Sequence, residues 1–280
     1  MGQALGRLLR ERGESIVAIA SRSPERAALA AAFVGGAAQP VTYAELPQHA
    51  ANILIAVPDD AIAAVARFLA AAGMHQGIAL HTSGAHGPEA LAPLAAAGVA
   101  CGTLHPLQTV ANPAEGVRNL PGMAFAIDGA PQAVAWARQL VALLDGLPLN
   151  IPAASRPLYH AAAVMAGNYL TVLISTAVML MKEAGVDEAV ARLALAPLAR
   201  TSVENAFRLG PVAALTGPIV RGDADTVRGH LAALAEAPAA VAGLYRAAGL
   251  ATLEIARRRG LAELQAGAIE ELLRQGERCD

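Results

Sequence analysis

The stretch "MGQALGRLLRERGESIVAIASRS" (residues 1–23) decides the fold. Its first part predicts an amphipathic helix, because Leu5, Leu8 and Leu9 recur on one face between arginines. Gly13 ends this helix, and "SIVAIA" (residues 15–20) predicts a short β-strand. A helix that feeds straight into a strand is the second half of a strand–helix–strand unit. We therefore expect another strand ahead of the helix.

Gly2 indicates what that strand carries. In dinucleotide-binding folds the first strand runs into a G-x-G-x-x-G turn, and the third glycine lies inside the helix that follows. Gly2 fits the third position, so we expect the first strand and the first two glycines, about ten residues, to precede Met1. The sequence leaves one alternative open, in which Met1 is the true first residue and the sheet closes up or stays incomplete.

Composition limits the class of protein. A chain of 280 residues with 55% hydrophobic and 16% charged residues is too apolar for disorder and long enough for two domains. A net charge of −2 gives no bulk attraction to nucleic acid or to an anionic membrane, so neither is an expected partner. Cys101 and Cys279 form neither a disulfide framework nor a metal motif, so no metal is expected and a reducing cytoplasm is the expected location.

One uncharged segment, residues 161–181, is as long as a membrane span. Asn168 and several hydroxyl residues interrupt it, so we expect a buried helix of a water-soluble domain. One helical domain gives such a segment little cover, and we therefore expect a homodimer formed through this domain.

Strands alternate with helices in the first half of the chain. Strands are expected at residues 15–20, near Val41, and at residues 52–58, 77–84, 99–106, 122–128 and 147–152. This spacing predicts an α/β domain with a Rossmann-like parallel sheet whose first strand is missing. Only helical patterns follow residue 155. We place the boundary between an α/β domain of residues 1–152 and an all-α domain of residues 153–280.

The end of the second expected strand reads Ser21-Arg22-Ser23. An acidic residue at this place binds the ribose of NAD, whereas an arginine with small hydroxyl residues suits the 2′-phosphate of NADP. The sequence therefore favours NADP as the cofactor. Alternatively, Ser23 only caps the next helix and the arginine is solvated.

Polar turns follow three later strands at the edge of the sheet that binds ligands in this class of fold. We expect a crevice there, formed by Val57, Pro58 and Ser83 around the cofactor and by His105 near the substrate. Asp59 and Asp60 are expected to cap the following helix rather than to bind a ligand. His81 either faces the crevice or is a buried, hydrogen-bonded histidine.

The chain resembles the bacterial Rossmann-like oxidoreductases whose C-terminal part is the domain of unknown function 2520. Five segments carry this resemblance in the same order: "IAVPDDAI" (55–62), "HTSGA" (81–85), "LHPLQT" (104–109), "YHAAAVMAGNYL" (159–170) and "TGPIVRGD" (216–223). That family is similar in turn to pyrroline-carboxylate reductases, ketopantoate reductases and the 6-phosphogluconate dehydrogenase group. The resemblance implies a nicotinamide-dependent oxidoreductase and covers the chain except for the first strand.

Hydride delivery to a carbonyl or imine leaves an atom that must be protonated. His160 and Asn168 lie about 80° apart around one predicted helix, so His160 is the expected proton donor and Asn168 the expected substrate anchor. Alternatively, both are structural polar residues of helix interfaces. The related dehydrogenases carry a lysine one turn before an asparagine, but Val164 stands at that position here.

Thr216 and Arg221 are the expected binding residues for a substrate carboxylate, unless Arg221 pairs with Asp223, which is expected to cap a helix. Together these features predict an NADP-dependent oxidoreductase that reduces a small carboxylated carbonyl or imine compound. The alternative is a dinucleotide-binding homologue with a sensory or structural role and no catalysis.

Overall fold

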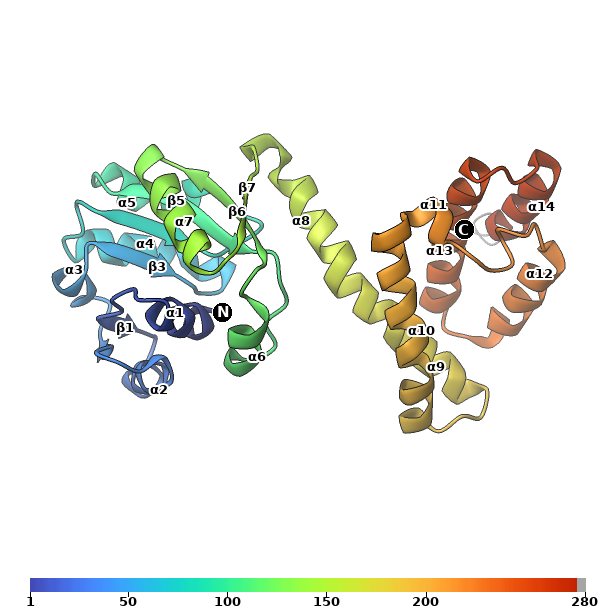
Figure 1. The fold of residues 1–280 in the computed structure, drawn as a ribbon, viewed down its shortest axis with the longest axis horizontal. Coiled ribbons are helices and arrows are strands. Elements are labelled where there is room, and N and C mark those ends of the chain that lie inside the picture. Colours follow the sequence, from blue (N-terminus) through green and yellow to red (C-terminus); the bar gives the residue numbers. More distant parts are fainter. Residues whose placement is uncertain (276–280) are drawn as a thin grey trace. The chain divides into compact units, whose positions relative to one another are not determined.

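The computed structural model describes residues 1–275, which fold into two compact units, Met1–Tyr169 and Leu170–Asp280 (Figure 1). The boundary between the units lies beyond the expected one at residues 152 and 153. The reason is that the helix after the last strand stays bonded to the sheet, through Arg156 and Tyr159. Cys101 is a buried free thiol, and Cys279 lies outside the described residues.

All seven expected strands form in the first unit. They are β1 (Ala18–Ala20), β2 (Gln39–Val41), β3 (Asn52–Ile55), β4 (Ile78–His81), β5 (Ala100–Pro106), β6 (Ala124–Gly129) and β7 (Leu147–Asn150). The helices are α1 (Gly2–Glu11), α2 (Pro24–Val34), α3 (Leu46–His49), α4 (Ile62–Ala71), α5 (Ala92–Ala96), α6 (Pro113–Asn119), α7 (Pro131–Leu143) and α8 (Arg156–Val164). Strand–helix alternation therefore produces the Rossmann-like α/β architecture that the spacing predicts.

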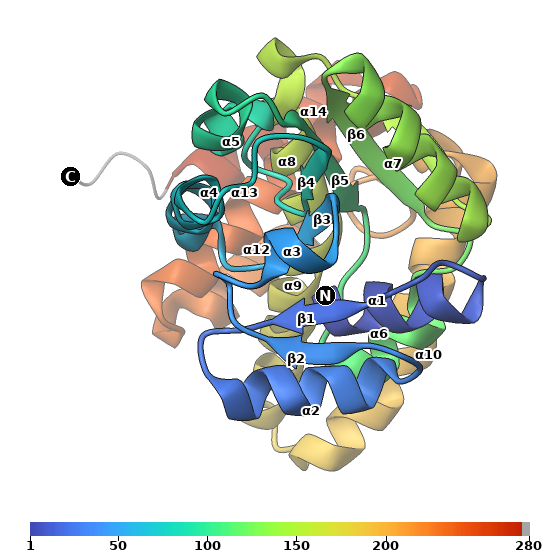
Figure 2. The same ribbon diagram turned by 90° about the vertical axis from the view of Figure 1, so that its left-hand side faces the viewer.

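The strands form two separate sheets. Strand β1 pairs with β2, and the other five are ordered β3-β4-β5-β6-β7 (Figure 2). Neighbouring strands run parallel except β5 and β6, which are antiparallel. This pair departs from the parallel sheet that the sequence predicts. The cause is the connection between them: α6 packs on α1, where Gly116 meets Ala4, instead of crossing over the sheet.

Two apolar cores cover the two faces of the larger sheet. Leu5, Leu8 and Leu9 of α1 pack with α7 on one face, which confirms the predicted amphipathic helix. On the other face α4 and α5 pack against Ile53 and Ile55 of β3. Successive side chains along each strand point to opposite faces of the sheet, so each strand contributes residues to both cores.

The second unit is entirely helical over its described residues, as predicted. Its helices are α9 (Leu170–Glu183), α10 (Glu188–Leu209), α11 (Pro211–Ala214), α12 (Ala224–Ala233), α13 (Ala239–Arg258) and α14 (Glu263–Arg274). Its core lies among α12, α13 and α14, where Val227, Leu253 and Ile269 are fully buried. A π-helical turn, Met165–Tyr169, joins α8 to α9.

No residue of the helix expected to be buried, residues 161–181, is buried: each is partly or fully exposed. Ala153–Glu183 is a continuous helical stretch, and no residue of its most apolar 18-residue segment is buried. The reason is that α12, α13 and α14 build the core of the second unit. Within the described part of the chain this stretch and Ala239–Arg258 are long and apolar enough to cross a membrane. Length and composition alone are weak support for a membrane span.

Candidate active site

A row of polar side chains crosses the middle of the larger sheet. His81 of β4 lies opposite Thr103 of β5, which in turn lies opposite Asp128 of β6. Residues directly opposite one another point to the same face, so the three side chains are neighbours. His105, two residues further along β5, points to that face as well. The sheet thus carries a polar patch where alternation would otherwise place core residues.

His81 is fully buried and shapes the loop after β4. The Ser83 N–H donates to its Nδ1 at 3.2 Å, so its Nε2–H donates to the Gly87 carbonyl at 2.8 Å. Burial lowers the pKa of His81 and keeps the ring neutral. Of the two interpretations that the sequence allows for His81, the buried hydrogen-bonded histidine is confirmed.

Ser83 is also buried and also serves this loop. Its Oγ accepts the N–H groups of Ala85 and His86, both at 3.2 Å. Gly84 follows, and a Cβ there would lie 2.6 Å from the His105 ring. The loop after β4 therefore rests directly on His105, and only glycine allows this close approach.

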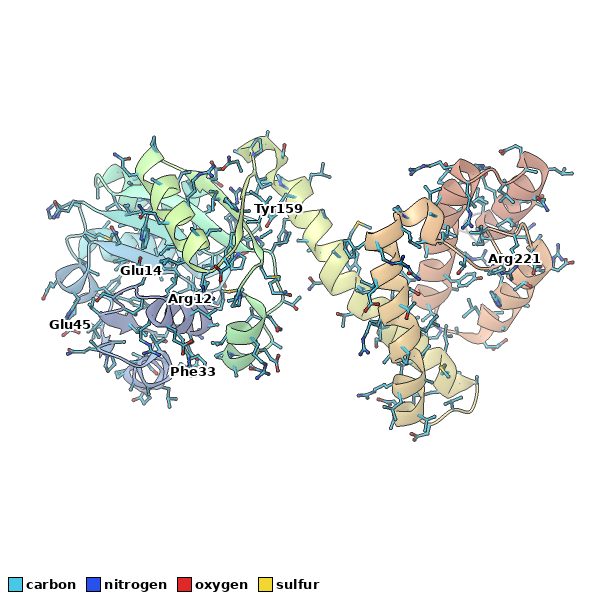
Figure 3. All side chains as sticks on the ribbon, viewed as in Figure 1. Arg12, Glu14, Phe33, Glu45, Tyr159 and Arg221 are labelled. Atoms are coloured by element: carbon cyan, nitrogen blue, oxygen red, sulfur yellow. The ribbon has the colours of Figure 1, made fainter. Side chains whose placement is uncertain are left out.

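His105 forms a hydrogen-bonded pair with Tyr159 of α8. Tyr159 is labelled in Figure 3. The His105 Nδ1 lies 2.7 Å from the Tyr159 hydroxyl, and the two rings meet edge to face with centroids 5.7 Å apart. Burial, with smaller contributions from His160 and Arg156, lowers the pKa of His105 to about 4. Burial also raises the pKa of Tyr159 to about 12. Near neutral pH the pair therefore consists of an uncharged imidazole and a protonated phenol.

Arg156, also on α8, brings a buried positive charge to the polar patch. Its side chain is 3% exposed, and Nη2 lies 3.1 Å from the Asp128 carboxylate. Within the described chain its Nε and Nη1 are buried without a hydrogen-bond partner, and so is the Thr103 hydroxyl. A guanidinium that uses only one of its three nitrogens still has N–H donors for a second anion.

Neither Arg156 nor Tyr159 was expected at the site from the sequence. Tyr159 does stand in the segment "YHAAAVMAGNYL", directly before His160. Both residues lie in the first turns of the helix that follows the last strand. A helix in this place can pack against the end of the sheet, and this is the one feature of the sequence that could have indicated them.

The two residues expected on one helical face differ in burial. His160 is partly buried and close enough to His105 to influence its pKa. Asn168 is exposed within the π-helical turn. The 80° angle between them assumes α-helical geometry, and a π turn, bonded from i to i+5, changes that angle. The shared face stays a prediction.

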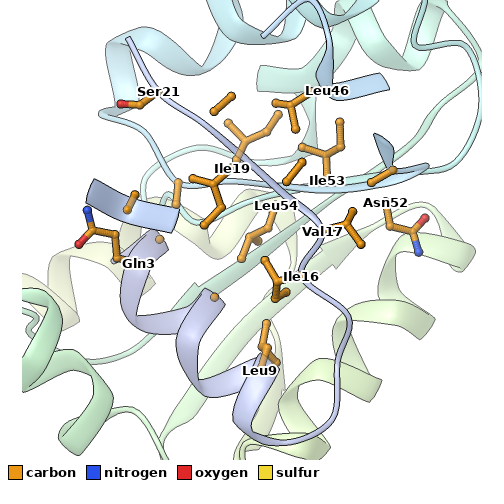
Figure 4. A pocket seen from close by; sticks show the side chains of 18 of the residues that line it. Gln3, Leu9, Ile16, Val17, Ile19, Ser21, Leu46, Asn52, Ile53 and Leu54 are labelled. Carbon is orange, nitrogen blue, oxygen red and sulfur yellow. The ribbon is translucent and has the colours of Figure 1, made fainter. Parts of the chain in front are cut away.

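A cavity of about 880 Å³ lies between β1 and β3 (Figure 4). Gly2, Ser21 and Val57, three of the residues expected to bind the cofactor, line this cavity. A Cβ on Gly2 would lie 2.9 Å from the Ala56 Cβ, so glycine allows α1 to start against the end of β3. That close helix–strand contact is the role of the third glycine in a dinucleotide-binding turn.

The segment after β1 contains a helix cap and an exposed arginine. Ser23 caps α2, since its Oγ accepts the Arg26 N–H at 3.3 Å, and the cap interpretation is confirmed. The backbone N–H of Glu25 and the Ser23 hydroxyl lower the pKa of the Glu25 carboxyl. The Arg22 side chain is exposed and free to meet a ligand at this end of β1.

The turn after β3 differs from the expected helix cap. Pro58 is exposed and occupies the N-cap position of a 3₁₀ turn, Asp59–Ala61, in which neither aspartate makes a side-chain cap. The expectation that Asp59 and Asp60 cap a helix is therefore wrong. Asp59 is instead close enough to His105 for its charge to raise the pKa of that ring against the effect of burial.

Thr216 and Arg221 lie in the second unit, both exposed, in the turn before α12. Asp223 caps α12, as predicted, and accepts the Thr226 N–H at 3.0 Å and the Thr226 hydroxyl at 2.6 Å. These hydrogen bonds lower the pKa of Asp223, and the charge of Arg221 lowers it further. Arg221 is thus near Asp223 and still solvent-facing.

Two family models match the chain. Residues 1–106 match the Rossmann-like domain, and residues 123–252 match a domain of unknown function, DUF2520. The chain is a Rossmann-like protein with a DUF2520 domain. This assignment confirms the resemblance seen in the five sequence segments. No curated protein matches the chain.

Solved structures share the fold at low identity. A Bacteroides fragilis protein described as a candidate NADP oxidoreductase has 22% identity and a TM-score of 0.68, over 96% of this chain and 93% of that one. A Thermotoga maritima protein has 20% identity and a TM-score of 0.65, over 98% and 97% of the two chains. Pyrroline carboxylate reductase of Plasmodium falciparum, with NADP bound, has 12% identity and a TM-score of 0.56, over 97% and 94%. At these identities the likeness establishes the common fold.

The depressed pKa of His105 predicts a pH-dependent stability. Because this pKa is about 4 in the folded chain and 6.5 for an ordinary histidine, the unfolded chain binds more protons between those values. Stability is full above pH 6.5 and falls as the pH drops toward 4. We expect His105→Gln to reduce the slope of unfolding free energy against pH by up to about 1.4 kcal/mol per pH unit.

Urea unfolding at several pH values between 4 and 7 measures this slope. His49→Gln, at an exposed histidine of α3, is the matched control and should leave the slope unchanged. Equal slopes in the His105→Gln variant and the unmodified chain would show that His105 is not held neutral by burial.

Proposed function

We propose that the protein is an NADP-dependent oxidoreductase that reduces the carbonyl or imine group of a small carboxylated compound. The observation that carries this proposal is the uncharged His105–Tyr159 pair at the carboxyl edge of the sheet, beside a buried and partly unpaired Arg156. The B. fragilis and P. falciparum proteins, and an imine reductase of Streptomyces aurantiacus with a TM-score of 0.58, support the reaction class.

The residues around the cavity fit a dinucleotide. Gly2 and Val57 border it near the start of α1, and Ser21 borders it at the end of β1. Arg22 and Ser23 would meet the adenosine 2′-phosphate, because an exposed guanidinium and a hydroxyl donate to it. Pro58 and Ser83 would flank the nicotinamide at the ends of their strands. The bound cofactor supplies the hydride; the other steps belong to side chains of this chain.

Helix α8 supplies the proton in this proposal. When hydride adds to the substrate carbon, the electron pair of the C=O or C=N bond moves to the oxygen or nitrogen, which takes a proton. His160 is the donor that the sequence indicates. Tyr159 is the donor that the structure adds: with His105 protonated on Nδ1, the ring donates to the phenolic oxygen and leaves the hydroxyl hydrogen free for the substrate. The same N–H then stabilises the phenolate.

Arg156 is the proposed partner of the substrate carboxylate. Its Nε and Nη1 each have an unpaired N–H that can donate to a carboxylate oxygen, and a substrate carboxylate would supply acceptors to a guanidinium that is otherwise short of them. Thr216 and Arg221 stay predictions from the sequence, as does Asn168. Cytoplasmic location also stays a prediction.

We also propose a homodimer formed through the second unit. Helices α9 and α10 expose large apolar side chains: Val172, Leu173, Ile174, Val190, Leu193, Leu198, Phe207 and Leu209. A groove of about 590 Å³ between these two helices is lined by Ile174, Val178 and Leu195, among others. Contiguous apolar surface of this kind is characteristic of subunit interfaces.

Cofactor choice is the first test. NADPH should bind the protein at least tenfold more tightly than NADH, a difference of about 1.4 kcal/mol. Arg22→Ala should remove most of that preference, because it removes the charge facing the 2′-phosphate. Calorimetry measures both affinities, with Arg67→Ala, at an exposed arginine of α4, as the control. Equal affinities in the unmodified protein would refute NADP specificity.

The proton donor is tested by turnover. After a screen of carboxylated imines and carbonyl compounds by NADPH absorbance, the donor's variant should lower kcat about a hundredfold and leave NADPH affinity unchanged. His160→Ala and Tyr159→Phe compete for this outcome. If neither variant lowers kcat by tenfold, the proton does not come from α8. If the chain binds NADPH but turns over nothing, the non-catalytic alternative holds.

The dimer is tested by sedimentation at micromolar concentration. Phe207→Ser with Leu193→Glu should convert the dimer to a monomer, because both side chains lose apolar burial at the interface. Leu264→Glu changes a side chain of α14 that is 89% exposed and lies on another helix, so it should leave the dimer intact. A monomeric unmodified protein would contradict the proposed dimer.

A further inference from the structure

Three buried hydrogen-bond donors of the polar patch have no acceptor within the described chain. They are the Thr103 hydroxyl and the Nε and Nη1 groups of Arg156. Thr103 is fully buried, and the Arg156 side chain is 3% exposed. Most buried polar groups in folded proteins are paired, because an unpaired one has lost its water without gaining a partner. These donors therefore call for an acceptor that the described chain does not supply.

Asp128 brings the three donors close to one another. Thr103 of β5 lies directly opposite Asp128 of β6 in the antiparallel pair, so the two side chains are neighbours on one face. The Arg156 Nη2 lies 3.1 Å from the Asp128 carboxylate. The other Asp128 oxygen, Oδ1, accepts the Gly129 N–H at 2.9 Å. The hydroxyl and the guanidinium thus flank one carboxylate, and the hydroxyl does not bond to it.

Packing alone does not explain a threonine at this position. Cys101, two residues earlier on β5, faces the same side of the sheet and belongs to its apolar core. A valine in place of Thr103 would have a similar shape and would extend that core without an unpaired hydroxyl. The hydroxyl therefore indicates a ligand that this part of the sheet binds.

The three donors can be reached from solvent beside Asp128. Its side chain is 31% exposed, so water comes within one hydrogen bond of the buried guanidinium. Glu89, the other carboxylate near Arg156, is exposed, and water weakens the attraction of both carboxylates for the guanidinium. The charge of Arg156 also acts on the partly buried Tyr159, where it lowers the pKa against the effect of burial. A ligand at these donors would therefore lie near one proposed proton donor.

We propose that Thr103 is a second binding residue for the substrate carboxylate. Its hydroxyl donates to that carboxylate together with the Nε and Nη1 groups of Arg156, so that all three buried donors gain an acceptor. The two oxygens of a carboxylate offer about four acceptor sites, and their charge strengthens each hydrogen bond. A cation offers no acceptor, and a neutral carbonyl brings no charge to the guanidinium. This role of Thr103 rests on the proposed function, in which the substrate is carboxylated.

The test uses formate as the smallest carboxylate probe and formamide as its neutral counterpart. The NMR signal of the Arg156 Nε–H is followed in the protein of residues 1–280 at constant ionic strength. Arg156→Lys assigns this signal by its loss. We expect formate to shift the signal downfield until the site is saturated, because a charged acceptor forms the stronger hydrogen bond, and formamide to shift it far less.

Thr103→Val removes the hydroxyl at a similar shape and should weaken formate binding about tenfold, because one hydrogen bond to a charged group is lost. Thr103→Ser keeps the hydroxyl and should bind formate as the unmodified protein does. Thr201→Val, the same change at an exposed threonine of α10, is the matched control. Without formate, Thr103→Val should raise Tm, since it removes an unpaired buried hydroxyl.

Unchanged formate affinity in Thr103→Val would overturn the proposal. An Arg156 signal that formate does not shift, that formamide shifts equally, or that exchange with water removes would overturn it as well. Once a substrate is known, Thr103→Val should raise KM about tenfold with kcat unchanged. Formate binding that depends on Thr103, in a protein that turns over no carboxylated compound, would uphold the site and refute only the proposed function. Turnover with a KM that is unaffected by Thr103→Val would refute only the role of Thr103.

Discussion

The unpaired edges of β1 and β3 are the constraint on which the rest of the first unit depends. The other unpaired strand edges of the described chain, at β2 and β7, are the outer edges of the two sheets, and an apolar core covers each face of the larger sheet. Helix α1 packs on the large sheet through its leucines and places Gly2 against Ala56 at its start, while α3 contacts β1 and packs Leu46 on the other core. These two helices therefore set the width of the cavity between β1 and β3.

A second constraint is the polar patch at the opposite side of β3. The register of β4, β5 and β6 brings His81, Thr103 and Asp128 together, and α8 covers them with Arg156 and Tyr159. Burial keeps His81 and His105 neutral, and the positive charge of Arg156 adds a smaller effect in the same direction. Such an arrangement stores a proton on Tyr159 and a positive field on Arg156 next to the strand ends, which is suited to a substrate that gains negative charge as it is reduced.

The sequence predicted the strands and the amphipathic α1, because apolar periodicity reports local geometry directly. It also indicated His105, since polar residues at three strand ends converge on one edge. It did not indicate Arg156 or Tyr159, whose importance depends on which face of the sheet α8 covers. The antiparallel β6 depends on where α6 packs, and the π turn at Asn168 depends on backbone hydrogen bonding along α8 and α9. Such features are decided by tertiary contacts, and no local pattern in the sequence encodes them.

A crystal structure of the protein with NADPH tests the central claim most directly. The account predicts the pyrophosphate at the N-terminus of α1, beside the cavity between β1 and β3. The 2′-phosphate should lie beside Ser21, Arg22 and Ser23, and the nicotinamide at the ends of β3 and β4. A dinucleotide bound away from this cavity would contradict it.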